Sequence, residues 1–446
     1  MSRIFYRYWL VLKESGFVIA NELRTIFRDS GVMVIFFLGT LAYPFLYKAM
    51  YWNEQITGIP VAVVDLSQSV ESREFLHKWN ATPEVKLAYS CASMSEAEQL
   101  LRDQKVHGII YFPRDYSSQL ADPLGKAHIS LYCDMSSFLY MKGIYLSCNM
   151  VMLESMRNIQ VDRYEYMGLG PEMAWALVQD APYTETALYT TNGGYGSFLI
   201  PAVLVMILHQ TLFFGICMLA GTVREERTEL YRIPGRKRGY SAFRTILGRG
   251  SAYFLIYYAL AAILLGALPR LFDIPHIGSI WDILRFNVPF IMSVIFFAIC
   301  VGFFIRNREA GLVLLISTSL VFLFVAGISW PKEMIPAGWR YFSYFIPYTW
   351  AANGFIHINS MGASLWTTRT EYLALWGLTA GYFVLAVTMF FIAGYRRDLQ
   401  ETRLVSVSEA LHIGGVSDWT ILSDEPEQAQ QPESHYKNDA YNTEHR

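Results

Sequence analysis

Charged residues are scarce in this chain of 446 residues. They make up 17% of it, whereas hydrophobic residues make up 53%. A soluble globular protein typically has about 25% charged residues, so the composition excludes that class and predicts an integral membrane protein. The formal net charge of −2 says little about partners, because the charges are distributed unevenly along the chain.

The motifs of the common catalytic and metal sites are also missing. The sequence contains no GxxxxGK[ST] phosphate loop, no GxSxG nucleophile elbow and no HExxH motif, and its nine histidines do not pair at metal-ligand spacing. Its five cysteines form no CxxC pair. We therefore expect that the chain is not an enzyme and holds no metal or cofactor of its own, and nothing indicates a nucleic-acid partner.

Long apolar runs are plentiful, and six of them are long enough to cross a bilayer, since about 20 residues at 1.5 Å each cover its hydrocarbon core of about 30 Å. They begin near residues 31, 196, 251, 286, 311 and 372. Arg306 and Arg308 separate the fourth run from the fifth. An arginine near the bilayer centre costs roughly 2.5–3.5 kcal/mol, so two spans joined by a tight turn are favoured over one long helix.

Hydrophobicity falls between the first and second runs. Strands are expected at about 59–65, 85–89, 107–113 and 127–132, and helices at about 69–79, 93–104 and 136–162. Strands and helices that alternate at this length indicate a compact α/β domain over residues 51–194. Cys91, Cys133 and Cys148 fall in this domain, which leaves one disulfide among them open.

The predicted fold is thus a polytopic α-helical membrane protein with six transmembrane helices and an inserted extracytoplasmic α/β domain. An amphipathic helix over 1–30 precedes the first span at 31–50, and five spans follow over 195–397. The segment 221–249 carries eight basic residues against three acidic ones, which places it, and with it both termini, in the cytoplasm. The polar, acidic tail over 398–446 is predicted to be disordered, either inert or regulatory.

No span contains an acidic residue, although a transporter driven by protons or sodium usually needs one at membrane depth. Energy should then enter from outside the membrane. The short charged stretch 224–231 lies within the predicted coupling loop 221–249, where a rigid helix could dock in a groove of a soluble partner. A solvated basic loop fits the same pattern.

Two further sites stand out in the spans. After the fifth apolar run, prolines and aromatic residues predict a bend and a half-inserted re-entrant hairpin over 329–354, with gate residues Trp330, Pro331, Glu333, Pro336 and Pro347. An ordinary outer loop with interfacial aromatic residues is the alternative. His209 and Gln210 form the one clear polar cluster inside a span, and they are either functional or simply hydrogen-bonded to a neighbouring helix.

In order and spacing these features resemble the permease subunits of type-2 ABC exporters, in the branch with a large extracytoplasmic domain between spans one and two. The resemblance covers about residues 15–397. It is carried by the N-terminal helix, the strands near 61–65 and 108–113, the stretch 224–230 and, most specifically, the sequence GISWPKEMIP at 327–336.

The resemblance implies two permease copies, or a permease and a paralogue, assembled with separate ABC ATP-binding subunits that hold ATP and Mg²⁺. It implies that those subunits contact the chain at Glu22, Arg24, Asp29, Glu225, Glu226, Arg227, Thr228 and Glu229. It also implies a bacterial inner-membrane location and, in similar systems, a periplasmic membrane-fusion adaptor that feeds an outer-membrane channel. Residues 231–235 and the tail after 403 depart from the pattern of the family.

The function we expect is ATP-driven export of a hydrophobic or amphiphilic substrate, drug-like or lipid-linked. A receptor-like or scaffolding membrane protein whose extracytoplasmic domain binds a ligand is the alternative. Simple anchoring would not need six spans and an aromatic hairpin, which favours the exporter.

Overall fold

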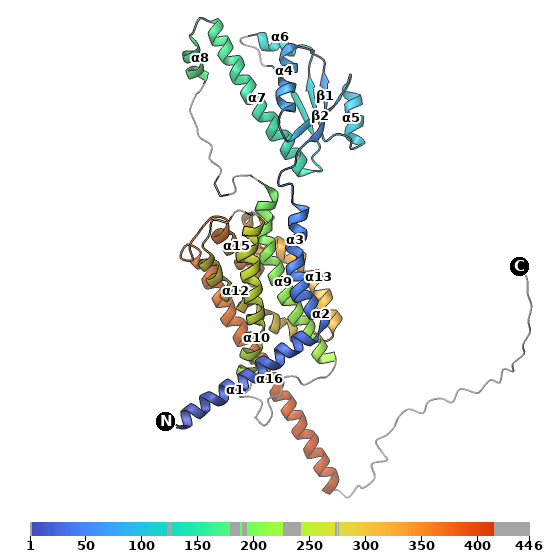
Figure 1. Cartoon of the computed structure of the whole chain (residues 1–446). Helices are drawn as coiled ribbons and strands as arrows, with labels where there is room; N and C mark the ends of the chain where they lie inside the picture. The colour runs from blue at the N-terminus through green and yellow to red at the C-terminus, as the bar shows by residue number, and fades with distance from the viewer. Residues whose placement is uncertain are drawn as a thin grey trace, which may run out of the picture.

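The computed structural model describes residues 2–122, 127–178, 188–189, 194–225, 242–272, 274 and 276–413, with side chains from residue 15 to residue 393. Within these ranges six helical segments are long and apolar enough to cross a membrane, which confirms the predicted class. They are Ser30–Met50, Tyr195–Glu225, Ala242–Leu271, Ile280–Gly302, Arg308–Val325 and Arg369–Ala393. They form one bundle, and the inserted domain stands at one end of it (Figure 1).

Short π-helical segments interrupt two of the spans. The first span consists of α2 (Ser30–Met33), the π-helix η1 (Val34–Gly39) and α3 (Thr40–Met50). The third consists of α10 (Ala242–Ala261), the π-helix η3 (Ala262–Ala267) and α11 (Leu268–Leu271). Helices α9 (Tyr195–Glu225), α12 (Ile280–Gly302) and α13 (Arg308–Val325) are each one continuous span.

Helix α9 is the centre of the bundle. An 18-residue stretch of it is buried without exception, and it packs against α12, α13 and α3. A helix that is apolar on all sides suits a position in which other helices surround it. A Cβ atom on Gly215 would lie 1.9 Å from Cε1 of Phe36, so the close approach of η1 to α9 requires glycine there. Helices α13 and α16 (Arg369–Ile413), in contrast, leave most of their apolar surface open.

The inserted α/β domain is present as predicted. Its sheet has the order β2-β1-β3-β4, built from β1 (Ile59–Asp65), β2 (Val85–Ser90), β3 (Gly108–Phe112) and β4 (Ser130–Cys133). β2 and β3 run parallel to β1, whereas the edge strand β4 is antiparallel to β3. The helices are α4 (Val70–Asn80), α5 (Met94–Arg102), α6 (Tyr116–Ala121), α7 (Phe138–Tyr166) and α8 (Pro171–Val178).

Two small cores hold the domain together, one on each face of the sheet. On one face Phe75 and Trp79 of α4 and Ile144 of α7 are buried, and the indole Nε1 of Trp79 donates a hydrogen bond to Oγ of Ser147 at 3.0 Å. On the other face Ala97 of α5 packs on β1 and β3. All five cysteines are free thiols, so the disulfide left open by the sequence is not formed in this structure.

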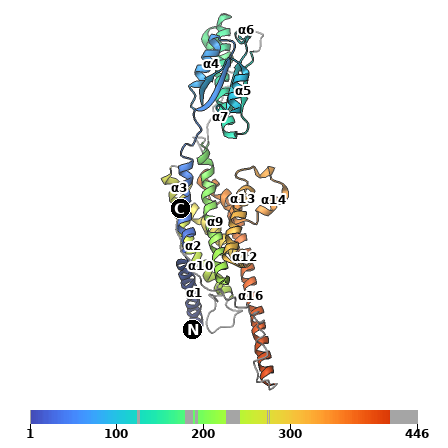
Figure 2. The ribbon, with the colours of Figure 1, turned by 90° about the vertical axis from the view of Figure 1, so that its right-hand side faces the viewer.

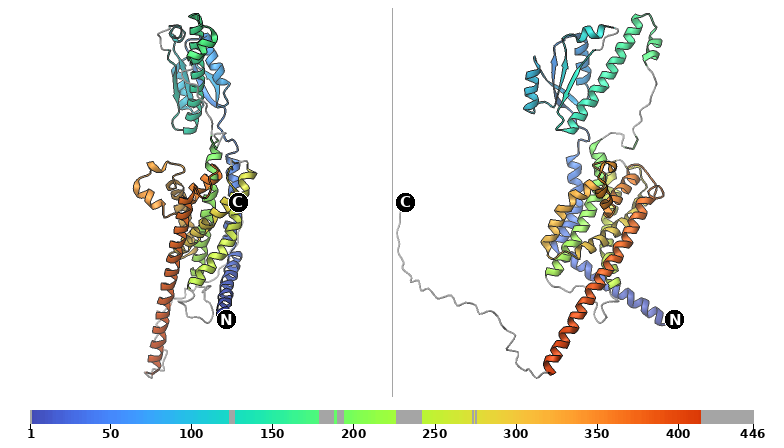
Figure 3. Two further views of the ribbon diagram at one scale, coloured as in Figure 1. Left: turned by 90° about the vertical axis from the view of Figure 1, so that its left-hand side faces the viewer. Right: turned by 180° about the vertical axis from the view of Figure 1, so that it is seen from behind.

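The α/β domain lies at one end of the bundle, and helix α1 (Ser2–Arg28) and the last turns of α16 lie at the other (Figures 1 and 3). We refer to these as the domain end and the α1 end. Helix α16 reaches Ile413, so the prediction of a disordered tail from residue 398 is wrong for residues 398–413. This stretch is rich in helix-forming residues and contains neither glycine nor proline. Residues 414–446 lie outside the described residues.

Candidate functional site

Asp29 marks the break between α1 and the first span. Its backbone is extended, with φ −84° and ψ 105°, and its Oδ1 accepts hydrogen bonds from the backbone N–H groups of Gly31 at 3.0 Å and Val32 at 3.1 Å. This is the geometry of an N-cap, in which a side chain satisfies amides that the first turn of a helix leaves open. The cap fixes the direction in which α1 continues into the membrane.

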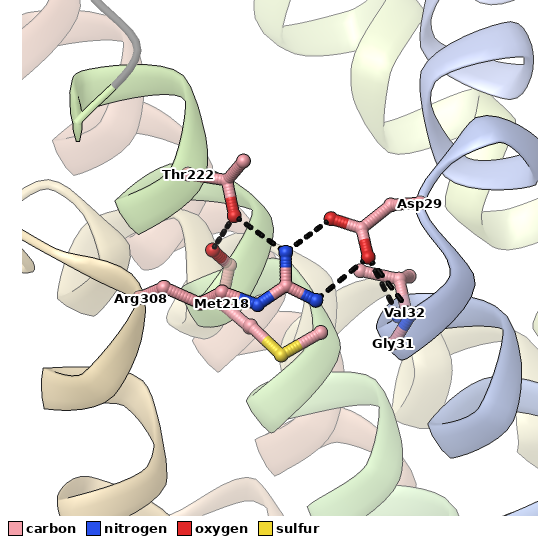
Figure 4. A network of polar contacts seen from close by, with 6 residues as sticks. All are labelled: Asp29, Gly31, Val32, Met218, Thr222 and Arg308. Atoms are coloured by element: carbon pink, nitrogen blue, oxygen red, sulfur yellow. Dashed lines mark hydrogen bonds and ion pairs between the residues drawn. The ribbon is translucent and has the colours of Figure 1, made fainter.

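The same carboxylate binds Arg308, the first residue of α13. Nη1 of Arg308 lies 2.8 Å from Oδ2 and Nη2 lies 2.8 Å from Oδ1, and Nη1 also donates to Oγ1 of Thr222 in α9 at 3.2 Å (Figure 4). Two parallel bonds of this kind are strong and directional. A Cβ atom on Gly31 would lie 2.2 Å from Nη2 of Arg308, so glycine leaves the room that the guanidinium occupies.

Asp29 is ionised at neutral pH in this setting. Its side chain is only 10% exposed, and burial by itself would raise the pKa of the carboxyl. The hydrogen bonds from Arg308 and from the two backbone amides outweigh burial, so the pKa lies below the ordinary 3.8.

The last turn of α9 is fastened to the turn before α13 as well. Nη1 of Arg224 donates to the carbonyl oxygen of Ile305 at 2.6 Å, and its guanidinium lies 5.2 Å from the ring centre of Phe303. The backbone N–H of Arg308 donates to Oε2 of Glu225 at 3.3 Å. We call Asp29, Thr222, Arg224, Glu225 and Arg308 the α1-end clamp.

A second contact joins α1 to α10. Oε1 of Glu22 accepts hydrogen bonds from Nε of Arg249 at 3.1 Å and from the hydroxyl of Tyr253 at 2.7 Å. The Glu22 side chain is 1% exposed, so its carboxylate is buried in this structure, and contact of Glu22 with an ATP-binding subunit stays a prediction. Its carboxylate is covered by α10, a helix more than 200 residues away in the sequence. Arg24, two residues on, is exposed.

Together these contacts attach α1 to both sides of the predicted coupling loop. Asp29 binds Arg308 at the start of α13, Arg308 in turn donates to Thr222 at the end of α9, and Glu22 binds Arg249 of α10. Glu225 is exposed at the end of α9. Glu226, Arg227, Thr228 and Glu229 lie outside the described residues.

The sequence did not reveal the partners of these carboxylates. In the sequence Arg308 marks only an interruption between two spans, and no local pattern distinguishes Thr222, Arg249 or Tyr253. The one available signal was an arginine at the start of an apolar run, because a charge at that position needs a partner.

The predicted hairpin consists of two different halves. The outer half contains the 3₁₀ turn η4 (Lys332–Met334) and α14 (Ala337–Ser343), and it projects sideways at the domain end (Figure 2). The inner half is α15 (Pro347–Asn359), which is buried against α9, α12 and α16 and ends five residues beyond the predicted boundary at 354. The structure thus shows a segment that re-enters the bundle.

The gate residues divide between these halves. Trp330, Pro331, Glu333 and Pro336 are exposed in the outer half, whereas Pro347 is buried at the first turn of α15. Hydrogen bonds to two carbonyl groups hold the hairpin in place: Nε1 of Trp350 donates to Tyr344 at 2.9 Å, and the hydroxyl of Tyr382 donates to Phe345 at 2.5 Å. Aromatic side chains cover the exposed part, namely Trp330, Trp339, Tyr341, Phe342, Tyr344 and Phe345.

His209 lies at the middle of α9 and is completely buried. The rings of Phe213, Phe297, Phe322 and Tyr348 surround it, with centres 5.5–6.4 Å from the imidazole. Among the described residues neither ring nitrogen has a hydrogen-bond partner, and the same is true of the side-chain amide of Gln210. The alternative of a histidine hydrogen-bonded to a neighbouring helix is therefore not supported. Thr211, which follows Gln210, does accept such a bond, from the hydroxyl of Thr40 at 3.0 Å.

Within the described residues, six spans, of which α9 is buried at the centre, define a multi-pass membrane protein with a re-entrant segment at one end and an ion-pair clamp at the other. Residues 31–388 match the family described as "ABC-2 family transporter protein", so the chain belongs to that family. The linearmycin resistance permease protein LnrN of Bacillus subtilis (strain 168) is 22% identical to it over 387 residues. That alignment covers 81% of this chain and 94% of the relative. The resemblance to ABC permeases is confirmed, and the chain is a transport subunit rather than an enzyme.

Proposed function

We propose that this chain is the membrane-spanning subunit of an ATP-driven exporter that moves a hydrophobic or amphiphilic molecule, drug-like or lipid-linked, across a bacterial inner membrane. A separate ABC ATP-binding subunit supplies the hydrolysis, and a second copy or a paralogue completes the permease. The observation that carries this proposal is the attachment of α1 to α9, α10 and α13 around the coupling loop.

The α1 end is the cytoplasmic end in this proposal, because the basic segment 221–249 begins and ends there. Arg24 and Glu225 are exposed at this end and offer contacts to a soluble subunit. A displacement of α1 passes through the Asp29–Arg308 ion pair into α13 and, through the hydrogen bond from Arg308 to Thr222, into α9. Helix α9 packs against α15 at the domain end. ATP hydrolysis on one side of the membrane thereby changes the packing of the re-entrant segment on the other side.

The name of the relative supports a toxic organic substrate, since that protein is a resistance permease. A periplasmic adaptor and an outer-membrane channel remain partners that the α/β domain could meet, in line with its size and position. The receptor-like alternative gains no support from the family, which is one of transporters.

The decisive experiment is purification of the tagged chain in mild detergent with mass spectrometry of its companions. We expect an ATPase that contains a phosphate loop. Recovery of the folded chain alone, at good yield, would contradict the proposal.

Coupling is tested in the reconstituted complex with Asp29→Asn. Asparagine still caps α2 but cannot form the ion pair with Arg308, so we expect transport to fall about tenfold per ATP hydrolysed, which corresponds to about 1.4 kcal/mol. Asp282→Asn is the matched control. Its carboxylate lies 4.0 Å from Arg285 of the same helix, α12, whose side chain is 69% exposed, and the loss of so long and solvated a contact should change nothing. Equal effects of the two substitutions would show that the clamp has no special role.

A further inference from the structure

The α/β domain contains a pocket that the exporter mechanism above does not use. It lies between the edge strand β4 and the first half of α7, and its volume is about 540 Å³. Five of the side chains that line it carry sulfur: Cys133, Met135, Met141, Cys148 and Met152. A volume of this size falls within the range of about 300–1,000 Å³ that is typical of small-molecule sites.

The position of the pocket follows from the strand order. β1 begins where the chain arrives from the first span, and β3 runs parallel to it. Cys133, at the end of the antiparallel β4, pairs with Gly108, the first residue of β3. Cys133 and the start of α7 therefore lie at the end of the domain that faces the bundle (Figure 1). A molecule that leaves the bundle at its domain end would meet this part of the domain first.

The lining is uncharged. Ile129 and Leu131 add to the sulfur-bearing side chains, and the two thiols stay protonated. Burial raises the pKa of the Cys148 thiol to about 12, with a smaller contribution from the nearby Cys133, and burial also raises the pKa of Cys133. Methionine side chains are flexible and polarizable, so a surface rich in them adapts to apolar molecules of different shapes.

Two polar groups complete the lining. Tyr145 and Asn149 lie one turn apart on α7, and Nδ2 of Asn149 donates to the carbonyl oxygen of Tyr145 at 3.0 Å. That bond leaves the amide oxygen of Asn149 as an acceptor for a ligand. An apolar wall with a few polar groups is the arrangement that binds and orients an amphiphile.

We propose that this pocket binds one amphiphilic organic molecule, with its apolar part against the methionines and its polar group at Tyr145 and Asn149. The binding itself needs only the pocket. The idea that the bound molecule is the exported substrate rests on the proposed function.

The test uses the full-length chain in lipid nanodiscs and a long-chain alkyl probe that carries a photoreactive diazirine. After illumination and proteolysis, labelling of peptides from residues 129–152 is measured against labelling of peptides from the spans, which reports partition into the lipid. We expect saturable labelling of residues 129–152 that an unlabelled amphiphile of the same chain length displaces.

Three variants separate the pocket from the surface around it. Met141→Glu combined with Met152→Glu places charge in the pocket, and we expect the specific labelling to fall about tenfold. Asn149→Phe fills the same space with an apolar ring and should reduce labelling by occlusion, so the result does not depend on one kind of change. Met150→Glu is the control, since Met150 is on the same helix, is 71% exposed and does not line the pocket.

Two results would overturn the proposal: labelling that rises without saturation, or labelling that falls as strongly in Met150→Glu as in the double variant. Either would show that the surface of α7 adsorbs the probe nonspecifically. Displacement by a co-purifying protein, and not by the unlabelled amphiphile, would overturn it too. The two proposals fail separately: transport with no specific labelling rejects the pocket alone, and specific labelling without an ATPase partner rejects the exporter alone. Asp29→Asn should lower transport per ATP hydrolysed about tenfold and leave labelling unchanged.

Discussion

Asp29 fulfils two structural roles with one carboxylate. It caps the first span through two backbone amides and holds Arg308 through two further hydrogen bonds. Single substitutions can separate these roles, because asparagine is as good a cap as aspartate but carries no charge.

We expect Asp29→Asn to lower the free energy of unfolding by about 1.5–3 kcal/mol at neutral pH, since the bonds that it weakens are assisted by charge. The effect should depend on pH. The folded state depresses the pKa of Asp29 below 3.8, so its stabilisation is fully present above that value and is lost as pH falls through the lower, folded pKa.

Thermal melting of the wild type and of Asp29→Asn, compared across acid and neutral pH, checks this expectation. The difference in melting temperature should be constant above about pH 5 and should shrink in strong acid. A difference that grew in acid would show that the carboxyl is protonated in the folded protein.

Cys148 should be an unreactive thiol. With a pKa of about 12 against the ordinary 9.0, it has about a thousandfold less thiolate at neutral pH than a free cysteine. We expect slow labelling of Cys148 by iodoacetamide in the folded chain and normal labelling in denaturant, measured by mass spectrometry. Rapid labelling of the native chain would mean that the helix α7 separates readily from β4.

At the scale of elements, α1 is a helix fixed at two points seven residues apart. Its contact with α10 is the more buried of the two, since the side chains of Glu22 and Arg249 are 1% and 8% exposed. A buried charge that loses its partner is costly, whereas replacing both members of a buried pair by apolar residues is often tolerated.

Glu22→Leu should therefore destabilise the chain by about 3 kcal/mol, and the double change with Arg249→Met should recover part of that loss. Hydrogen exchange along α1 provides the measurement, with faster exchange in the single variant than in the double variant. Identical exchange in all three proteins would show that α1 is held by its apolar face alone.

The outer half of the hairpin predicts a second effect at this scale. Trp330 and Phe342 are 56% and 47% exposed, and aromatic side chains of this kind favour the membrane interface. We expect Trp330→Asp and Phe342→Asp to reduce export several-fold, as an acidic group opposes contact with lipid.

Gly338→Asp supplies the matched control for that experiment. Gly338 is an exposed residue of α14, the helix that contains Phe342. A Cβ atom on Gly338 would have no atom of another residue within 4 Å. An acidic residue in the first turn of a helix also favours its dipole. Export that falls equally in all three variants would argue against a role for the aromatic surface.

The whole molecule shows which parts of a structure a single sequence can reveal. The six spans follow from apolar runs, the α/β domain from alternating strands and helices, and the re-entrant segment from Pro331, Pro336 and Pro347. All of these are local patterns. The clamp is different, because Asp29 and Arg308 lie 279 residues apart and no local pattern connects them. The burial of Glu22 cannot be read from local sequence for the same reason, since a helix far along the chain covers it.

The length of α16 has a consequence for whatever surrounds the α1 end. The span accounts for Arg369–Ala393, and the helix continues over residues 394–413. At 1.5 Å per residue those 20 residues extend about 30 Å, roughly the diameter of a small domain. Helix α16 thus places Ile413 about 30 Å along the helix from the last residue of the span. A fluorescent protein fused after Ile413 would sit beyond a docked subunit rather than beneath it, and energy transfer to a membrane dye would measure that separation.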